Sequence, residues 1–116
     1  MSKRRVVITG LGIVSPVGNT VESAWENIIS GKSGITRISR FDASNFASQI
    51  AGEVKDFDIQ AYLSVKEARR MDTFIHFGMA AGIQAIRDAN LEDLTHLDAE
   101  RIGVNIGSGI GGLPMI

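Results

Sequence analysis

The feature that most limits the fold of this chain is residues 64–90, a helical pattern whose apolar residues take up nearly the whole circumference. Ser64 and Glu67 predict a capping box at its start, and neither glycine nor proline interrupts it before Gly78. The apolar residues between positions 71 and 86 are Met71, Phe74, Ile75, Phe77, Met79, Ala80, Ala81, Ile83, Ala85 and Ile86. A helix that is apolar on all sides is a buried helix. The segment therefore predicts a central helix that needs cover on several sides.

The pattern before this helix is of the α/β class. Residues 5–9 are apolar and β-branched on both faces, which favours a central strand of a parallel sheet. Residues 21–29 place their apolar side chains on one helical face. Asn19 is the expected N-cap, Glu22 completes the expected capping box, and Gly31 supplies a left-handed exit. A strand, a turn and a helix in this order begin an α/β unit.

The other segments offer little cover for the long helix. Residues 32–47 predict a long ordered loop, residues 48–54 an edge strand, and residues 101–106 another strand that leads into a glycine turn. A chain of 116 residues is one domain at most, and no internal repeat or linker divides it. These elements are too few to surround a buried helix. We therefore expect residues 1–116 to be a partial domain, the front part of a larger α/β protein.

Composition narrows the classes of function. Lysine and arginine number 12 and aspartate and glutamate 13, and this net charge of -1 favours neither a nucleic-acid partner nor an anionic membrane. The absence of cysteine removes disulfides, thiolate metal sites and a cysteine nucleophile from the chain. The start MSKRRVVITG lacks a signal-peptide cleavage site, and no stretch reaches the ~20 apolar residues of a membrane span. The expectation is a cytoplasmic protein with no membrane, metal or cofactor.

Two glycine-rich turns invite comparison with a dinucleotide site, in which G-x-G-x-x-G places backbone amides around a pyrophosphate. Gly10 and Gly12 fit, but Ser15 takes the third position and Pro16 removes a donor before the helix begins. Residues 107–112 match the glycine spacing, yet neither a helix nor a ribose-binding acid follows. An NAD(P)-dependent oxidoreductase domain is thus a disfavoured alternative, and close backbone packing is the preferred explanation of both turns.

Four spaced blocks carry a family resemblance: RRVVITGLGIVSPVGNTVESAWENIISGKSGI, FDASNFASQIAGEVKDFD, EARRMDTFIHFGMAAGIQAI and RIGVNIGSGIGGL. Together they resemble the beta-ketoacyl-[acyl-carrier-protein] synthases of bacterial fatty-acid synthesis, most closely the synthase II branch, over essentially the whole chain. The resemblance implies a thiolase-like fold of two related α/β halves, stacked in five alternating layers of helix and sheet and working as a homodimer. This chain would be the first part of the N-terminal half.

The resemblance also implies the chemistry. Such synthases are acyltransferases that elongate acyl chains by decarboxylative condensation of an acyl-enzyme with malonyl-carrier protein, using a cysteine nucleophile, two histidines and a lysine. None of these catalytic groups matches a position in this sequence. His76 falls within the long helix and His96 in a polar loop, so the first is expected to be structural and the second solvated. The segment alone is therefore expected to be inactive, with no catalytic residue.

The resemblance assigns binding roles to four residues. Ile110 would belong to the acyl pocket near the dimer interface, where it would limit chain length, unless it is only a turn residue. Lys66, Arg69 and Arg70 would dock acyl carrier protein, the partner in both its acyl and malonyl forms. The sequence places these cations in the first turns of the long helix, against the positive end of its dipole, so an anionic partner would offset the cost. The alternatives are a solvated basic face, and a carrier-docking module without catalysis.

Overall fold

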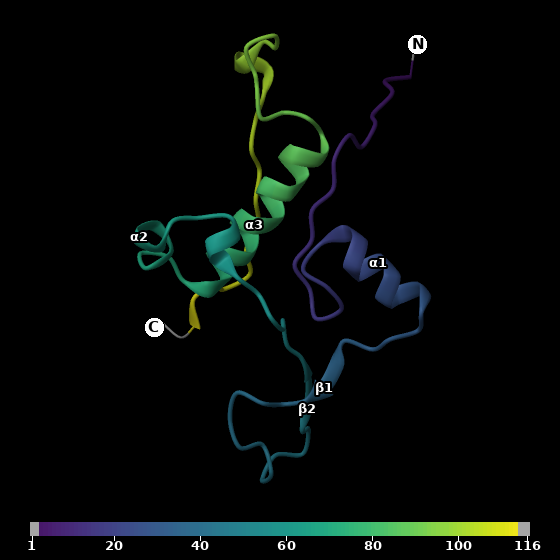
Figure 1. Cartoon of the computed structure of the whole chain (residues 1–116), viewed down its shortest axis with the longest axis vertical. Coiled ribbons are helices and arrows are strands. Elements are labelled where there is room, and N and C mark those ends of the chain that lie inside the picture. The colour runs from purple at the N-terminus through teal and green to yellow at the C-terminus, as the bar shows by residue number, and fades with distance from the viewer. Residues whose placement is uncertain (1–2, 114–116) are drawn as a thin grey trace.

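The computed structural model describes residues 3–113, which form an open assembly of short helices, one hairpin and long extended segments (Figure 1). The radius of gyration is 17.6 Å, against about 13 Å for a compact chain of this length. In chain order the elements are α1 (Val21–Ile29), β1 (Ile35–Arg37), β2 (Ile50–Gly52), the 3-10 turn η1 (Ile59–Ala61), α2 (Val65–Ala68), α3 (Thr73–Asp88) and the 3-10 turn η2 (Ala99–Arg101).

Helix α1 has the predicted extent, but its cap lies one residue later than the sequence predicts. Thr20 is extended (φ -138°, ψ 158°), and its side chain accepts a hydrogen bond from the Ser23 amide, forming a capping box with Ser23 rather than with Glu22. The prediction of Asn19 as the cap is wrong because the Asn19 amide instead donates to the Lys55 carbonyl at 2.7 Å. At the other end Gly31 has φ +69°, the left-handed exit that the sequence predicts.

The two strands form an antiparallel hairpin at one end of the molecule (Figure 1). Ile35 pairs with Gly52 and Arg37 with Ile50, and the Ile38 amide extends the ladder to the Gln49 carbonyl at 2.9 Å. The predicted edge strand over 48–54 is thus present in shorter form. The predicted loop over 32–47 is wrong in part, because its residues 35–37 supply the partner strand.

The predicted single helix over 64–90 is two helices, α2 and α3. The capping box of Ser64 and Glu67 is present, but α2 ends at Ala68 after one turn, with Arg69 as its C-cap. Asp72 is extended (ψ 161°) and its carboxylate accepts from the Thr73 amide at 2.6 Å, which starts α3 afresh. An aspartate that can cap a helix has therefore ended one helix and begun another.

Helix α3 is half-covered rather than buried within residues 3–113. Of its side chains only that of Ala80 is buried, whereas Phe74 is 39% and Ile86 44% exposed. Throughout these residues the buried side chains are those of four alanines: Ala24, Ala43, Ala68 and Ala80. The apolar faces that the sequence marks for burial lie open here.

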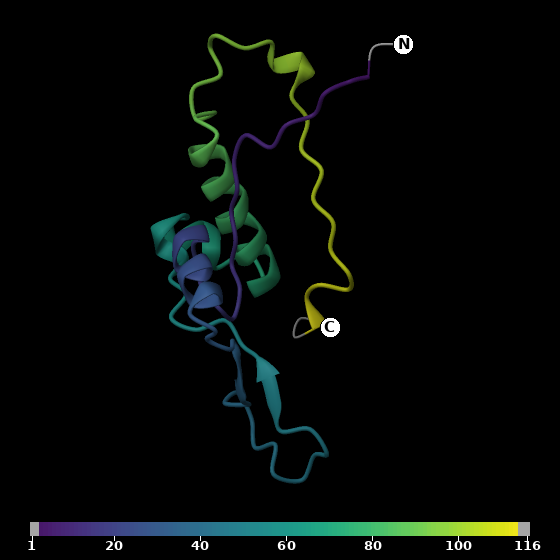
Figure 2. The same ribbon diagram turned by 90° about the vertical axis from the view of Figure 1, so that its right-hand side faces the viewer.

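The two segments predicted as further strands, 5–9 and 101–106, are not paired within the described residues. The first is extended and exposed, with Val6 91% exposed, and the second begins as the η2 turn and continues as extended chain. In Figure 2 the first segment, in purple, lies beyond the C-terminal end of α3, and the second, in yellow, descends toward the start of the helix. A strand needs a hydrogen-bonded neighbour, and none of residues 3–113 pairs with either segment. Among the same residues no helix combines the length and apolar character needed to cross a membrane.

Candidate functional site

The first glycine turn packs directly on the C-terminal half of α3. A Cβ atom on Gly10 would lie 2.7 Å from the Ala89 amide nitrogen, and one on Gly12 would lie 2.9 Å from the Gln84 Cβ. Two neighbouring amides are already bonded, that of Leu11 to Asp88 Oδ2 at 2.9 Å and that of Ile13 to Gln84 Oε1 at 3.2 Å. Amides bonded to α3 are not free to hold a pyrophosphate. The turn therefore serves close packing, which argues against the dinucleotide alternative.

Gln84 joins three segments at this point. Its Nε2 donates to the Asn19 carbonyl at 2.8 Å and to the Tyr62 hydroxyl at 2.9 Å, while its Oε1 accepts from Ile13. This one side chain thus ties the turn before α1 and the segment after β2 to α3. Sequence reasoning missed it, although a lone glutamine in an apolar run was a visible signal.

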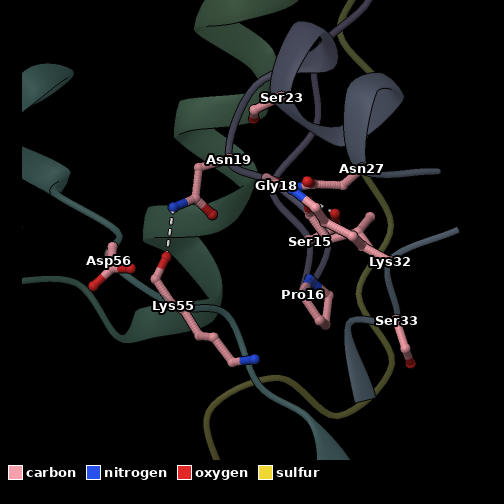
Figure 3. A pocket seen from close by; sticks show the side chains of 11 residues that line it. Ser15, Pro16, Gly18, Asn19, Ser23, Asn27, Lys32, Ser33, Lys55 and Asp56 are labelled. Carbon is pink, nitrogen blue, oxygen red and sulfur yellow. Dashed lines mark hydrogen bonds between the residues drawn. The ribbon is translucent and has the colours of Figure 1, made fainter. Parts of the chain in front are cut away.

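Below this turn lies a polar hollow between residues 15–19, Lys32 and Lys55 (Figure 3). Ser15 and Gly18 close a tight turn by reciprocal backbone hydrogen bonds of 3.0 and 3.1 Å. The Asn27 Nδ2 donates to the Val17 carbonyl at 2.6 Å, and Asn19 donates to Lys55 as the dashed line shows. Each of these two side-chain amides donates one N–H to a backbone carbonyl and so braces the turn.

The second glycine turn carries Ile110, one of the predicted site residues. Ile110 has φ +50°, a left-handed conformation that costs a β-branched residue roughly 1–3 kcal/mol. Its side chain is 77% exposed, so it is not packed beneath the following glycines. Just before it, an apolar groove of about 250 Å³ separates α3 from the extended chain, lined by Phe74, Ile75, Gly78, Met79, Ile106, Gly107 and Ser108.

The predicted carrier-docking residues gather on α2 and the turn after it. Lys66 lies in the last turn of α2, Arg69 is its C-cap and Arg70 follows; all three are exposed. Within residues 3–113 the one ion pair joins Arg87 to Glu92 at 3.2 Å, so no described carboxylate neutralises the three cations.

The dipole argument for this basic cluster is wrong. It assumed that the cations occupy the start of a long helix, whereas Arg69 and Arg70 follow the C-terminus of α2, where the dipole favours positive charge. Glu67 does not pair with them because its carboxylate accepts from the Ser64 hydroxyl at 2.6 Å and the Ser64 amide at 3.1 Å. These side-chain and backbone hydrogen bonds hold the pKa of Glu67 below its ordinary value.

The two histidines lie apart. The His76 Nε2 is 2.9 Å from the Ala68 carbonyl oxygen and so fastens α2 to α3, while His96 is exposed on the loop before η2. In the part of the chain that the structure describes, no three residues of metal-binding type come together.

Residues 3–115 match the family model described as Beta-ketoacyl synthase, N-terminal domain. The chain belongs to the beta-ketoacyl synthase family. It is 60% identical to 3-oxoacyl-[acyl-carrier-protein] synthase 2 of Vibrio harveyi and 53% identical to that of Coxiella burnetii, in each case over 100% of this chain and 28% of the relative. Among solved structures, the ishigamide ketosynthase/chain length factor matches 78% of this chain and 22% of its own length, with a TM-score of 0.66 and 33% identity.

These relatives bear on the fold. The chain spans a little over a quarter of the curated relatives it matches. Its mixture of helix and strand, together with the ketosynthase match, implies a thiolase-like α/β fold. The open apolar faces described above accord with a segment whose covering elements lie in the rest of such a protein.

Proposed function

We propose that this chain is the N-terminal segment of a 3-oxoacyl-[acyl-carrier-protein] synthase, an acyltransferase of fatty-acid synthesis. The whole enzyme would join an acyl group to the two-carbon unit left when malonyl-carrier protein loses carbon dioxide. The observation that carries the proposal is the 60% identity with a synthase 2 across all 116 residues. Identity sustained over every block of the chain is more specific than any single motif in it.

Within this enzyme the segment binds and orients but does not react. The family resemblance assigns the covalent step to a cysteine, and the sequence contains none. Of its histidines, His76 is engaged with the Ala68 carbonyl and His96 lies on an exposed loop. Acyl transfer needs a nucleophile held beside a base, so residues 1–116 alone have no route to an acyl-enzyme.

Carrier docking falls to the basic cluster of Lys66, Arg69 and Arg70. Their exposure, and the lack of a described carboxylate within 4.0 Å, leave three positive charges directed to solvent. Such a patch attracts an acidic partner over about a Debye length and speeds its association. Acyl carrier protein is the partner that the relatives' names supply.

Ile110 is the segment's contribution to the acyl pocket. It stands exposed at the end of an extended apolar stretch, beside the groove along α3, and is free to meet an acyl chain or another part of the enzyme. A homodimer in the cytoplasm, with no membrane or nucleic-acid partner, completes the proposal.

The test is condensation by the complete synthase that contains this segment. Purified with acyl- and malonyl-carrier protein, it should release carbon dioxide and form the elongated 3-oxoacyl product, while residues 1–116 alone should form neither product nor acyl-enzyme. The alternative supported by an observation is a carrier-docking module without catalysis, which the unpaired basic cluster favours. Tight carrier binding by the complete protein, with no condensation, would establish that alternative instead.

A further inference from the structure

The turn at residues 110–112 rests on the start of α3, against two side chains to which the proposed function gives no role. A Cβ atom on Gly111 would lie 2.6 Å from both Cγ and Cε2 of Phe74, so the glycine backbone lies directly on the aromatic ring. A Cβ atom on Gly112 would lie 3.1 Å from Asp72 Oδ2. The turn and the first residues of α3 are therefore in contact along two consecutive residues.

Asp72 is fixed in this contact. Its Oδ1 accepts from the Thr73 amide at 2.6 Å, which orients the carboxyl group at the start of α3. Its Oδ2 is buried and makes no hydrogen bond to any described residue, and it lies beside Gly112. One oxygen thus anchors the side chain while the other faces the turn.

Ile110 needs such support. Ile110 has φ +50°, and Gly112 has φ +86°. A β-branched residue keeps a left-handed conformation only where its surroundings enforce it. At 77% exposure its own side chain does not provide that enforcement, whereas the neighbouring glycines are pressed on Phe74 and Asp72.

We infer that Phe74 and Asp72 are positioning residues that fix the direction of Ile110 and thereby help to set the acyl chain length that the enzyme accepts. The inference rests on the proposed function, in which Ile110 meets the acyl chain. The two residues themselves touch the turn. Their position also links the two binding features, because Asp72 follows Arg70 by only two residues.

The glycines of the turn provide matched variants. Gly111→Ala places a methyl group against the Phe74 ring, whereas Gly109 has nothing within 4 Å of the corresponding Cβ position and no positive φ. Phe74→Ala removes the ring atoms that the methyl group would meet. In combination the two substitutions should relieve the clash that Gly111→Ala creates alone.

The experiment compares these variants in the complete synthase, using acyl-carrier-protein primers from short to long. For each we measure kcat/KM and, independently of condensation, the affinity for the same carrier-linked chains. Gly111→Ala should change the ratio of the longest to the shortest accepted primer by up to about 100-fold, the effect of a displacement near 1 Å. When Phe74→Ala is added to Gly111→Ala, the ratio should move back toward that of the unaltered enzyme by at least about fivefold. A coupling of this size is expected of residues in contact. Gly109→Ala should leave the ratio unchanged.

Independent, multiplicative effects of Gly111→Ala and Phe74→Ala on this ratio would overturn the inference, as would equal effects of Gly109→Ala and Gly111→Ala. If Gly111→Ala fails to fold, as judged by its thermal transition, Phe74→Leu alone tests the positioning role. An unchanged ratio of long to short primers in Phe74→Leu would refute that role. Ile110→Phe, measured in parallel, separates the two proposals. If Ile110→Phe shifts the primer ratio but Gly111→Ala and Phe74→Ala show no coupling, only the positioning role is refuted. If the unaltered enzyme shows no condensation and no chain-length-dependent binding, both proposals are refuted.

Discussion

Removing the basic cluster of Lys66, Arg69 and Arg70 should weaken the binding of acyl carrier protein, by an amount that follows from the exposure of the three side chains. The change is Lys66→Ala, Arg69→Ala and Arg70→Ala together in the complete synthase. All three side chains are exposed, and no described carboxylate lies within 4.0 Å of them, so their charges are available to a partner. An exposed ion pair contributes about 0.2–1 kcal/mol. Three such pairs sum to roughly 0.6–3 kcal/mol, a rise in KM for acyl-carrier protein of about 3- to 150-fold.

The assay is steady-state condensation as a function of acyl-carrier protein, at low salt and at 1 M salt. The unaltered enzyme should lose its advantage as salt rises, because the Debye length falls to about 3 Å at 1 M. The saturated rate kcat should change little, since the cluster contacts no reacting atom. A matched control removes three exposed cations elsewhere, Lys32, Arg40 and Lys55. An unchanged KM at low ionic strength, or an equal rise in the control, would refute the reasoning.

Three further predictions concern single residues. Ile110→Phe should shorten the longest acyl primer that the synthase accepts by filling the pocket, and an unchanged product distribution would remove Ile110 from it. Ser64→Ala should raise the lowered pKa of Glu67 toward its ordinary value, followed by NMR titration of the carboxyl group. Because the folded pKa is depressed, this stabilisation is present above the unfolded pKa and is lost as pH falls through the folded one, so the variant should lose that pH dependence. Gly12→Ala should destabilise the synthase by about 1–3 kcal/mol, since its Cβ would meet the Ala81 backbone; an unchanged urea midpoint would contradict this.

What the sequence predicted well is local. The capping box of Ser64 and Glu67, the left-handed Gly31 and the extent of α1 depend on contacts between residues a few positions apart, and all are present. The identity of the α1 cap depended on something farther away. Asn19 was a good capping residue by type, but its amide bonds to Lys55, 36 positions along the chain, and the cap passed to Thr20.

The break between α2 and α3 shows a second limit. Hydrophobic periodicity runs across residues 69–72 without a pause, so the pattern alone predicts one helix. Asp72 is a helix former of low propensity and a strong N-cap, and in the structure the second tendency prevails. The break at Asp72 also makes the dipole argument for the basic cluster wrong, because Arg69 and Arg70 follow the C-terminus of α2 and do not lie at the start of a long helix. The residue types of the candidate site were thus readable, whereas their electrostatic setting depended on one turn.

Two faces of α3 are in contact with extended segments of the chain. Residues 81, 84, 85 and 88 or 89 recur at helical spacing on one face, and there Gly10 and Gly12 bring the N-terminal segment against the helix. Residues 75, 78 and 79 face the groove along the segment that leads to Ile110. Two extended segments from opposite ends of the chain therefore pack on adjacent faces of α3. Each ends in a glycine-rich turn whose backbone lies directly against the helix. The first face combines this close packing with the polar groups of Gln84 and Asp88, which accept hydrogen bonds from the turn, whereas the second is lined mainly by apolar side chains.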